Sequence, residues 1–266
     1  MIRDITLGQY YPGSSWVHRL DPRTKIIATL VYVAAIFVVP DFIGFAIAFL
    51  ALAAVIVISG VPLKFLLRGL KPVFFIIALT FILNLFMIPG DVLVKWGFLT
   101  ITEQGLHTAV FMGIRLVLLI IVASMLTLTT KPINLTDGIE SLLKPFEKVG
   151  LPAHDLAMMM TIALRFIPTL LEETDKIMKA QQARGADFET GNIIRRAMSL
   201  IPILVPLFIS AFRIAQDLAM AMESRCYGGS GKRTRMNAVK LGGNDAVGFV
   251  LTAAFLAVII LERILI

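Results

Sequence analysis

The sequence predicts an all-α membrane protein with about five transmembrane helices and a cytoplasmic domain of long helices. Its 266 residues are 58% hydrophobic with a mean hydropathy of +0.85, whereas an ordinary globular domain is roughly 45–50% apolar. Several separate apolar runs approach the roughly 20 residues that a helix needs to cross a bilayer. A single cysteine, Cys226, excludes an internal disulfide and is typical of a protein facing a reducing compartment.

Four apolar runs lie in the first half of the chain and one lies at its end. The residues before the first run are polar, which argues against a cleavable signal peptide. We therefore expect a membrane domain over 1–129, a cytoplasmic domain over 130–243 and a C-terminal transmembrane helix over 244–266. The five runs are approximately 24–40, 42–59, 72–89, 105–129 and 246–266.

The distribution of basic residues predicts the orientation of these spans. Lys and Arg gather before the first run, between the second and third, and after the fourth, while the alternate loops have few. Cytoplasmic loops carry an excess of Lys and Arg, so the N-terminus is expected in the cytoplasm of a multi-pass cell-membrane protein. This pattern, rather than nucleic-acid binding, accounts for the net charge of +7. The basic residues are Arg3, Arg19, Arg23, Lys25, Lys64, Arg68, Lys71, Lys131, Lys144 and Lys148.

Three helices are expected in the cytoplasmic domain. A short helix over 136–148 is predicted to begin at an N-cap formed by Thr136 and Asp137 and to end at Gly150. A second covers 154–183 and a third covers 191–224. The second has apolar residues at spacings of three or four, or near-multiples, which predicts one packed stripe. These residues are Leu156, Met159, Ile162, Phe166, Leu170 and Ile177.

Prolines are expected to shape the two longer helices. Pro168 removes a backbone donor and should kink the second helix. Pro202 and Pro206, four residues apart, should bend the third toward one side. The uncharged stretch 197–212 within the third helix leaves two topologies open. It either lies at the membrane surface beneath the spans or forms a sixth span, which would place the two ends of the long helices on opposite sides of the membrane.

Each long helix ends in an arginine, in Ala183-Arg184-Gly185 and in Ser224-Arg225-Cys226. Helices often end at a left-handed glycine, and a basic residue in the last turn suits the helix dipole, so Arg184 could simply belong to a cap. Cys226 stands where such a cap would have glycine, so capping explains Arg225 less well. Because the planar guanidinium suits bidentate contact with carboxylates, we predict that both arginines dock into acidic grooves of a partner.

The segment Gly228-Gly229-Ser230-Gly231-Lys232-Arg233-Thr234 invites a phosphate-loop interpretation that fails. Cys226 stands where the pattern needs glycine, and Arg233 stands where it needs Ser or Thr. A flexible basic linker is expected instead, whose first two glycines could cap the preceding helix. His18, His107 and His154 share no metal-ligand spacing, and no nucleophile–base pair stands out. We expect no catalytic residue, cofactor or metal site in this chain.

Arg115 lies about ten residues inside the span 105–129, where a charge costs roughly 2.5–3.5 kcal/mol on insertion scales. It therefore needs a partner. Asp91 or Glu103 could be reached by snorkelling, or Asn84 could bond to it directly. We favour a structural role over a place in a transport path.

The same span carries small residues at four-residue spacing. Gly105, Ala109 and Gly113 give the helix one smooth face. Small faces allow helix backbones to approach closely in membranes. The face is expected to pack either within the protein or against another membrane protein.

Four strings together resemble the transmembrane T component of energy-coupling factor transporters. The resemblance covers essentially the whole chain. The strings are Leu20-Asp21-Pro22-Arg23-Thr24-Lys25, Leu164-Arg165-Phe166-Ile167-Pro168-Thr169-Leu170, Gln182-Ala183-Arg184-Gly185-Ala186-Asp187-Phe188 and Ala221-Met222-Glu223-Ser224-Arg225.

The resemblance implies a subunit without catalytic activity that bridges two cytoplasmic ABC ATPases and a small integral-membrane substrate-binding subunit, of which several could be exchanged. In this family two Ala-Arg-Gly motifs end the coupling helices and dock into the ATPases. The first motif is intact here, and the second keeps only Arg225, which leaves the geometry and strength of that contact open. Arg225→Ala is therefore expected to be milder than Arg184→Ala.

The implied function is to couple ATP hydrolysis to movement of the substrate-binding subunit during vitamin uptake. Closure of the ATPases would carry both arginines with it and shear the packed helices along their apolar faces. A dedicated cobalt or nickel T component is the first alternative. A self-sufficient secondary transporter, which would need paired repeats and broken spans, and an intramembrane enzyme are the others.

Overall fold

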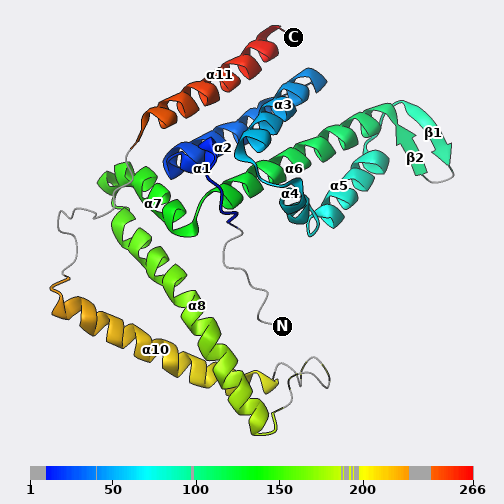
Figure 1. Ribbon diagram of the computed structural model, residues 1–266. Helices are drawn as coiled ribbons and strands as arrows, with labels where there is room; N and C mark the ends of the chain where they lie inside the picture. Colours follow the sequence, from blue (N-terminus) through cyan, green and yellow to red (C-terminus); the bar gives the residue numbers. More distant parts are fainter. Residues whose placement is uncertain are drawn as a thin grey trace. The chain divides into compact units, whose positions relative to one another are not determined.

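The computed structural model describes residues 10–39, 41–96, 99–186, 188, 192, 194, 198–227 and 241–265. Over these residues the regular structure is helical except for one two-stranded hairpin (Figure 1), which confirms the predicted class of all-α membrane protein. The chain divides into two compact units. We call Gly8–His154 with Val239–Ile266 the membrane unit and Asp155–Ala238 the arginine unit.

The membrane unit is built around four helices whose ends follow from local capping. The Asp21 carboxylate accepts a hydrogen bond of 2.8 Å from the Arg23 N–H at the start of α2, and Pro22 supplies the first helical residue. Gly60, with φ of 68°, ends α3 in the left-handed conformation. The four helices are α2 (Pro22–Val38), α3 (Phe42–Ser59), α6 (Glu103–Thr129) and α11 (Gly243–Leu265).

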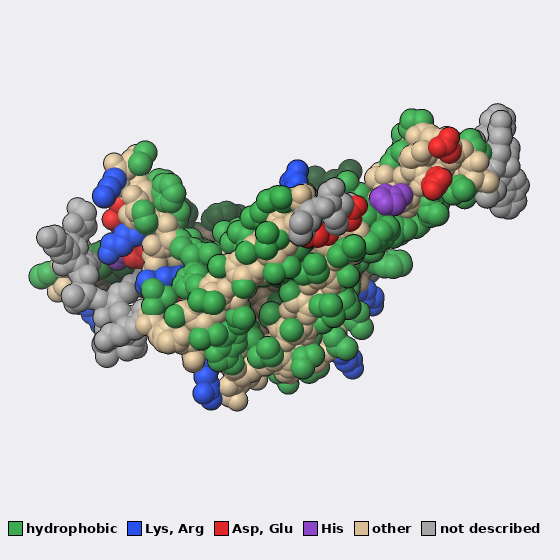
Figure 2. Space-filling model, turned by 90° about the horizontal axis from the view of Figure 1, so that it is seen from above, with side chains coloured by type: hydrophobic (Ala, Val, Ile, Leu, Met, Phe, Trp, Pro, Cys, Tyr) green, Lys and Arg blue, Asp and Glu red, His purple; other side chains and the backbone are tan. Residues whose placement is uncertain are grey.

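The core of the membrane unit lies between these four helices. Ile36 of α2, Ala48 of α3 and Ile259 of α11 are all 0% exposed. Tyr32 joins two of the helices directly, because its hydroxyl donates a hydrogen bond of 2.9 Å to the Ala48 carbonyl. The outer surface is apolar as well: hydrophobic side chains cover most of the face seen in Figure 2, as expected where lipid replaces water.

Shorter elements surround this core and differ from the prediction in three places. The predicted span 72–89 is a helix of 14 residues, too short to cross a bilayer alone. It is preceded by a separate helix at an angle of 60°, because Pro72 has no N–H to continue the first helix. The elements are α1 (Trp16–Arg19), α4 (Leu63–Leu70), α5 (Phe74–Met87), α7 (Pro132–Leu143) and the 3₁₀ helix η2 (Lys144–Val149).

The other two differences lie in connections. The segment between α5 and α6, for which no strand was predicted, forms an antiparallel hairpin of β1 (Val92–Trp96) and β2 (Leu99–Thr102). The predicted N-cap at Thr136 is wrong, because α7 already begins at Pro132 and the Thr136 hydroxyl donates to the Ile133 carbonyl inside the helix. Proline in a first helical turn loses no intrahelical bond, which explains the earlier start.

The number of candidate spans agrees with the prediction, but their identity differs. Over the described residues, five helices are long and apolar enough to cross a membrane, and α4 with α5 makes a sixth if that bent pair is one span. Two of them are the long helices of the arginine unit, which the sequence pattern predicts to lie in the cytoplasm. At 17 residues α2 lies at the lower limit for a span. The five are α3, α6, α8 (Ala153–Ala183), α10 (Ile201–Ser224) and α11.

The arginine unit contains α8 and α10, which run in opposite directions along the chain and are joined near their ends (Figure 1). The Gln181 side chain near the end of α8 donates to the Pro202 carbonyl at the start of α10, at 3.3 Å. The Tyr227 hydroxyl after the end of α10 contacts Met158 Sδ near the start of α8, at 2.7 Å. Five of the six predicted stripe residues of α8 are partly buried, while Met159 is exposed.

The three prolines take two different positions in these helices. Pro168 lies inside α8 and Pro206 inside α10. Pro202 lies in the first turn of α10 because that helix begins at Ile201 rather than at residue 191. A proline in a first turn removes no hydrogen bond, so Pro202 starts the helix instead of bending it.

Candidate functional site

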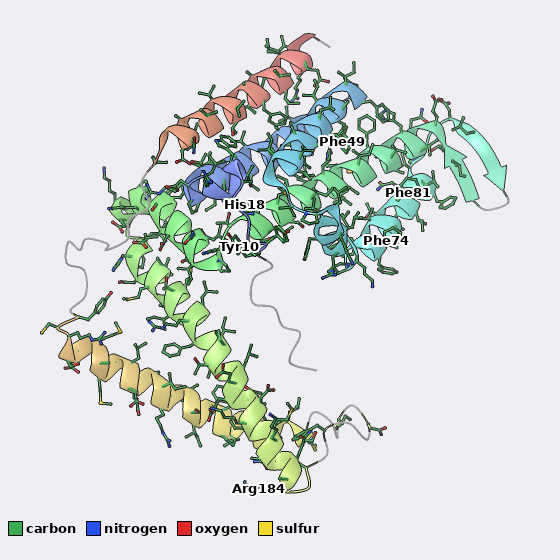
Figure 3. All side chains as sticks on the ribbon, viewed as in Figure 1. Tyr10, His18, Phe49, Phe74, Phe81 and Arg184 are labelled. Atoms are coloured by element: carbon green, nitrogen blue, oxygen red, sulfur yellow. The ribbon has the colours of Figure 1, made fainter. Side chains whose placement is uncertain are left out.

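The end of α8 is a Schellman motif built around Gly185. This glycine has φ of 86°, in the left-handed region. The Ala186 N–H donates to the Gln181 carbonyl at 3.0 Å, and the Gly185 N–H donates to Gln182 at 2.9 Å. These are the two hydrogen bonds that define the motif. Arg184, at the end of α8 (Figure 3), is therefore the C-cap residue, and it is exposed.

The end of α10 repeats this geometry with a different residue. Cys226 has φ of 56°. The Tyr227 N–H donates to the Met222 carbonyl at 2.9 Å, and the Cys226 N–H donates to Glu223 at 2.8 Å. Arg225 is thus the exposed C-cap residue of a second Schellman motif.

The second cap corrects the expectation that capping explains Arg225 less well than Arg184. Cys226 takes the left-handed position itself, so a later glycine is not needed for the cap. Gly228 and Gly229, with the rest of the segment Gly228–Thr234 interpreted above as a linker, lie outside the described residues, as does Asp187. The conformation costs an L-residue about 1–2 kcal/mol relative to glycine.

The two arginines project from opposite ends of the antiparallel pair. Met158, which contacts Tyr227, precedes Arg184 on α8 by 26 residues, or roughly 39 Å of helix. Within the described residues, neither guanidinium forms an ion pair. Ala183 and Ser224, which precede the arginines, end their helices and are exposed. The unit therefore presents two like cationic ends with free donors.

Arg115 has other partners than those predicted. Its Nη2 donates to the Val39 carbonyl at 3.2 Å. The guanidinium carbon also lies 5.7 Å from the ring centroid of Phe37 and 5.6 Å from that of Phe45, within cation–π range. The turn between α2 and α3 thus lies beside the middle of α6 and offers a carbonyl there.

The predicted partners of Arg115 are engaged elsewhere. The Asn84 amide donates to the Thr80 carbonyl at 2.8 Å in its own helix. The Asp91 carboxylate accepts from Gln104 at 3.1 Å. No ion pair joins Arg115 to Glu103 among the described residues. The contacts of Arg115 therefore hold helices of the membrane unit together.

The small face of α6 packs against α5. Ala109 is 0% exposed. A Cβ atom on Gly105 would lie 3.0 Å from the Leu85 carbonyl oxygen and 3.1 Å from that of Asn84. A Cβ on Gly113 would meet only Phe81, at 3.8 Å. Close helix approach is therefore required at Gly105 and relaxed at Gly113.

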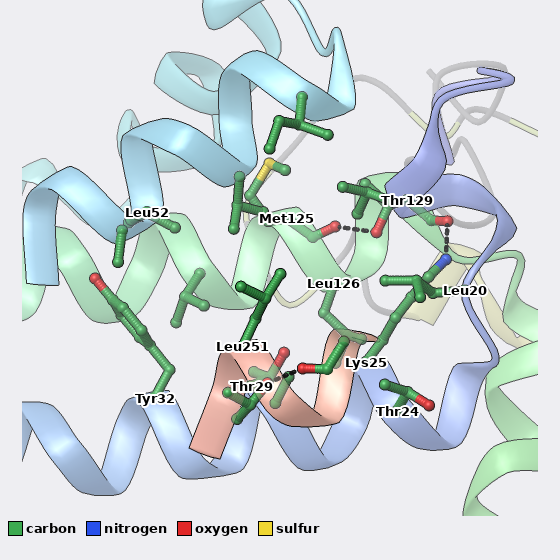
Figure 4. Close-up of a pocket in the computed structure, with 18 of the residues that line it drawn as sticks. Leu20, Thr24, Lys25, Thr29, Tyr32, Leu52, Met125, Leu126, Thr129 and Leu251 are labelled. Carbon is green, nitrogen blue, oxygen red and sulfur yellow. Dashed lines mark hydrogen bonds between the residues drawn. The ribbon is translucent and has the colours of Figure 1, made fainter. Parts of the chain in front are cut away.

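An apolar cavity of about 390 Å³ lies between α2, α3, α6 and α11 (Figure 4). Tyr32, Leu52 and Leu251 line its apolar part, and Lys25 and Thr129 lie at its polar end. Among the described residues, no three His, Cys, Asp or Glu side chains gather closely enough to hold a metal ion. The lining of the cavity is mainly apolar.

Comparison with known proteins identifies the family of the chain. The family model CbiQ, described as cobalt transport protein, matches residues 13–236. A protein of Thermosediminibacter oceani is 59% identical over 262 residues, 98% of this chain and 99% of its own length. A protein of Clostridium kluyveri is 54% identical over 99% of this chain and 98% of its own length. A protein of Bacillus subtilis is 45% identical over 96% of this chain and 98% of its own length.

All three relatives bear the name energy-coupling factor transporter transmembrane protein EcfT. The matches cover nearly the whole chain and therefore both units described above. The chain therefore belongs to the CbiQ family, among the transmembrane proteins of energy-coupling factor transporters.

Proposed function

We propose that this chain is the membrane scaffold that couples ATP hydrolysis by two ABC ATPase subunits to movement of a small substrate-binding membrane subunit. The observation that carries the proposal is the matched pair of Schellman ends. They hold Arg184 and Arg225 at the same C-cap position on two helices of one unit. Two like ends on one chain suit two partners of one kind.

The chemistry of the ends suits protein docking. Both guanidinium groups are exposed, so their donors are available for carboxylates of a partner groove. An arginine fork can make two parallel, charge-assisted hydrogen bonds to one carboxylate. The left-handed residue after each arginine turns the chain away from the helix axis. The chain therefore does not continue along the axis beyond the arginine, and the guanidinium can reach a partner at the helix end.

The opposite directions of α8 and α10 suit mechanical coupling. A partner attached to one end moves α8, and a partner attached to the other moves α10. When ATP brings the partners together, the two helices shift relative to each other, a motion of small displacement. Arg184 and Arg225 both face the cytoplasm in this proposal, as does the N-terminus.

One apolar face supports a partner within the membrane. Side chains recurring along α10 at helical spacing are exposed. Contiguous exposed apolar surface on a protein marks contact with another protein or with lipid. We assign this face to the substrate-binding subunit and the bilayer. The exposed residues are Ile201, Leu204, Val205, Phe208, Ile209 and Phe212.

The substrate is set by the separate subunit in this proposal, and vitamin uptake is the first assignment. Cobalt uptake is the second, because the matching family model carries the description cobalt transport protein. The two assignments differ in which small membrane protein co-purifies with the tagged chain. Uptake of labelled vitamin or of radioactive cobalt by the resulting complex then decides between them.

The proposal is tested by purifying the tagged chain from cells that express the whole transporter. Arg184→Ala and Arg225→Ala should each reduce ATPase recovery, and the double variant should abolish it together with uptake. Losing one partner of a desolvated charge pair costs about 2–5 kcal/mol. Since both caps have the same geometry, we now expect equal losses from the two single variants.

Lys179→Ala and Arg213→Ala are the matched controls, because each removes an exposed cation from the same two helices. Both should retain the ATPases. The double arginine variant retaining ATPases at wild-type yield would refute the proposal.

A further inference from the structure

The chain passes between the membrane unit and the arginine unit twice, after His154 and after residue 238. The chain leaves through the end of α6, then α7, into α8, and it returns after residue 238 into α11. Thr129 is the last residue of α6, and Asp245 lies in the first turn of α11. Both residues bond to the first turn of α2.

Lys25 makes the connection to α6. Its Nζ donates to the Thr129 carbonyl at 2.9 Å (Figure 4) and to the His18 carbonyl at 3.2 Å. Lys25 is 8% exposed and Thr129 is 3% exposed. A buried ammonium with two carbonyl acceptors fixes the end of α6 to α2.

Asp245 makes the connection to α11. Its Oδ1 accepts a hydrogen bond of 2.7 Å from the Asp21 N–H and one of 3.2 Å from the Thr24 hydroxyl. Its Oδ2 accepts 2.8 Å from the Gly242 N–H, which holds the residues just before α11. Asp245, Asp21 and Thr24 are all buried, so these bonds are shielded from competing water.

Two glycines bring further backbone onto the same turn. A Cβ atom on Gly138 of α7 would lie 3.0 Å from Pro22 Cβ. A Cβ atom on Gly248 of α11 would lie 3.1 Å from the Thr24 methyl group. The first turn of α2 is therefore in close contact with α7 and α11 while it bonds to α6.

We propose that Asp21, Thr24 and Lys25, with Asp245 and the Thr129 carbonyl, form a rigid anchor that makes α2, α6 and α11 move as one body when the arginine unit is displaced. These are positioning residues, and the inference rests on the function proposed above. Without the anchor, the first turn of α11 and the last turn of α6 would move independently of α2 and of each other. Motion of the arginine unit would then be lost at the crossings.

The experiment uses the whole complex, purified and placed in liposomes, with ATP hydrolysis and substrate uptake measured on one sample. Lys25→Met combined with Asp245→Ala should leave the ATPases bound. Uptake per ATP hydrolysed should fall about fivefold or more, the lower end of typical coupling between sites. General destabilisation would lower both rates together, so the ratio separates positioning from mere folding.

Lys64→Met, which removes an exposed lysine of the membrane unit, is the control and should leave the ratio unchanged. An unchanged ratio in the combined variant would overturn the anchor. Should that variant fail to assemble, Thr24→Val, which removes one hydroxyl bond, makes the same comparison. The proposed function is tested separately, by whether the arginine variants release the ATPases.

A reversible link gives a second test. A Cβ atom on Gly248 would lie 3.1 Å from the Thr24 methyl group, so Thr24→Cys with Gly248→Cys brings two thiols together where α2 meets α11, and a disulfide needs Cβ atoms about 3.5–4.5 Å apart. Asp245→Ala is added to remove the bonds that tie α11 to α2. Uptake per ATP should be low when the pair is reduced and should recover on oxidation. A ratio that falls on oxidation would show a moving joint and overturn the proposal. The single-cysteine variants, which also carry Cys226, control for oxidation elsewhere.

Discussion

Gly185 and Cys226 occupy the same position in two helix caps, with φ of 86° and 56° and the same pair of hydrogen bonds behind each. Glycine adopts this conformation without penalty, and cysteine does not. The α10 end thus keeps the shape of the α8 end at a cost in stability. The shape of the end, more than the identity of the residue after the arginine, is what the two motifs share.

Cys226→Gly should therefore stabilise the end of α10, by about 1 kcal/mol, and should leave the placement of Arg225 unchanged. Thermal unfolding of the purified protein measures the gain. Cys226→Ala keeps the left-handed penalty while it removes the thiol, so it should show no gain. Equal melting temperatures for the two variants would contradict this explanation.

Arg115→Met should destabilise the membrane unit. The substitution leaves the Val39 carbonyl without its donor and removes the contacts with Phe37 and Phe45; an unpaired buried acceptor costs about 1–3 kcal/mol. Arg115→Lys keeps a donor and should lose less. Unfolding in detergent measures both. Loss of uptake at wild-type stability would instead place Arg115 in a transport path.

Gly105→Ala should separate α5 from α6. The new methyl group would lie 2.7 Å from Thr102 Oγ1 and about as close to two α5 carbonyl oxygens, and such overpacking costs about 1–3 kcal/mol. Gly113→Ala on the same face meets only Phe81 at 3.8 Å and should be tolerated. Melting temperatures that fall equally in both variants would argue against close packing at Gly105.

Acid should weaken the N-terminal segment through His18. Burial lowers the pKa of this imidazole below 6.5. A hydrogen bond to the Tyr11 carbonyl raises the pKa, and the nearby charge of Lys25 lowers it. A lowered pKa in the folded state means that folding favours the neutral ring. The stabilisation from neutral His18 is therefore complete above pH 6.5, and it is lost as the pH falls through the pKa of His18 in the folded protein. Thermal stability should fall more steeply with acid in wild type than in His18→Gln.

Local patterns predicted the long helices well. The run 42–59 is α3, residue for residue, because its apolar stretch ends at a glycine that can take positive φ. The start of α8 was predicted one residue late, and its end at Ala183 was predicted correctly because Gly185 stops the helix. The helix α4 was not predicted, because Lys64 and Arg68 marked its segment as part of a basic loop.

Tertiary contacts were beyond sequence reasoning. Asp245 bonds to the Asp21 N–H across 224 residues, and no local pattern signals that pairing, although the string from Leu20 to Lys25 was already conspicuous. The partner of Arg115 is a backbone carbonyl of another helix, so a search for acidic side chains missed it. Residues other than glycine rarely adopt the left-handed conformation, so the conformation of Cys226 could be found only from the backbone of the structure.

Cys226 is the only sulfhydryl in the chain, it is exposed, and it directly follows Arg225. A fluorescent maleimide would therefore attach at one defined atom beside the proposed contact, with no need to engineer the protein. Its rate of attachment should drop when an ATPase covers that end and rise again when the subunit dissociates. The same dye, made unable to cross lipid, would report from intact cells which side of the bilayer this end occupies.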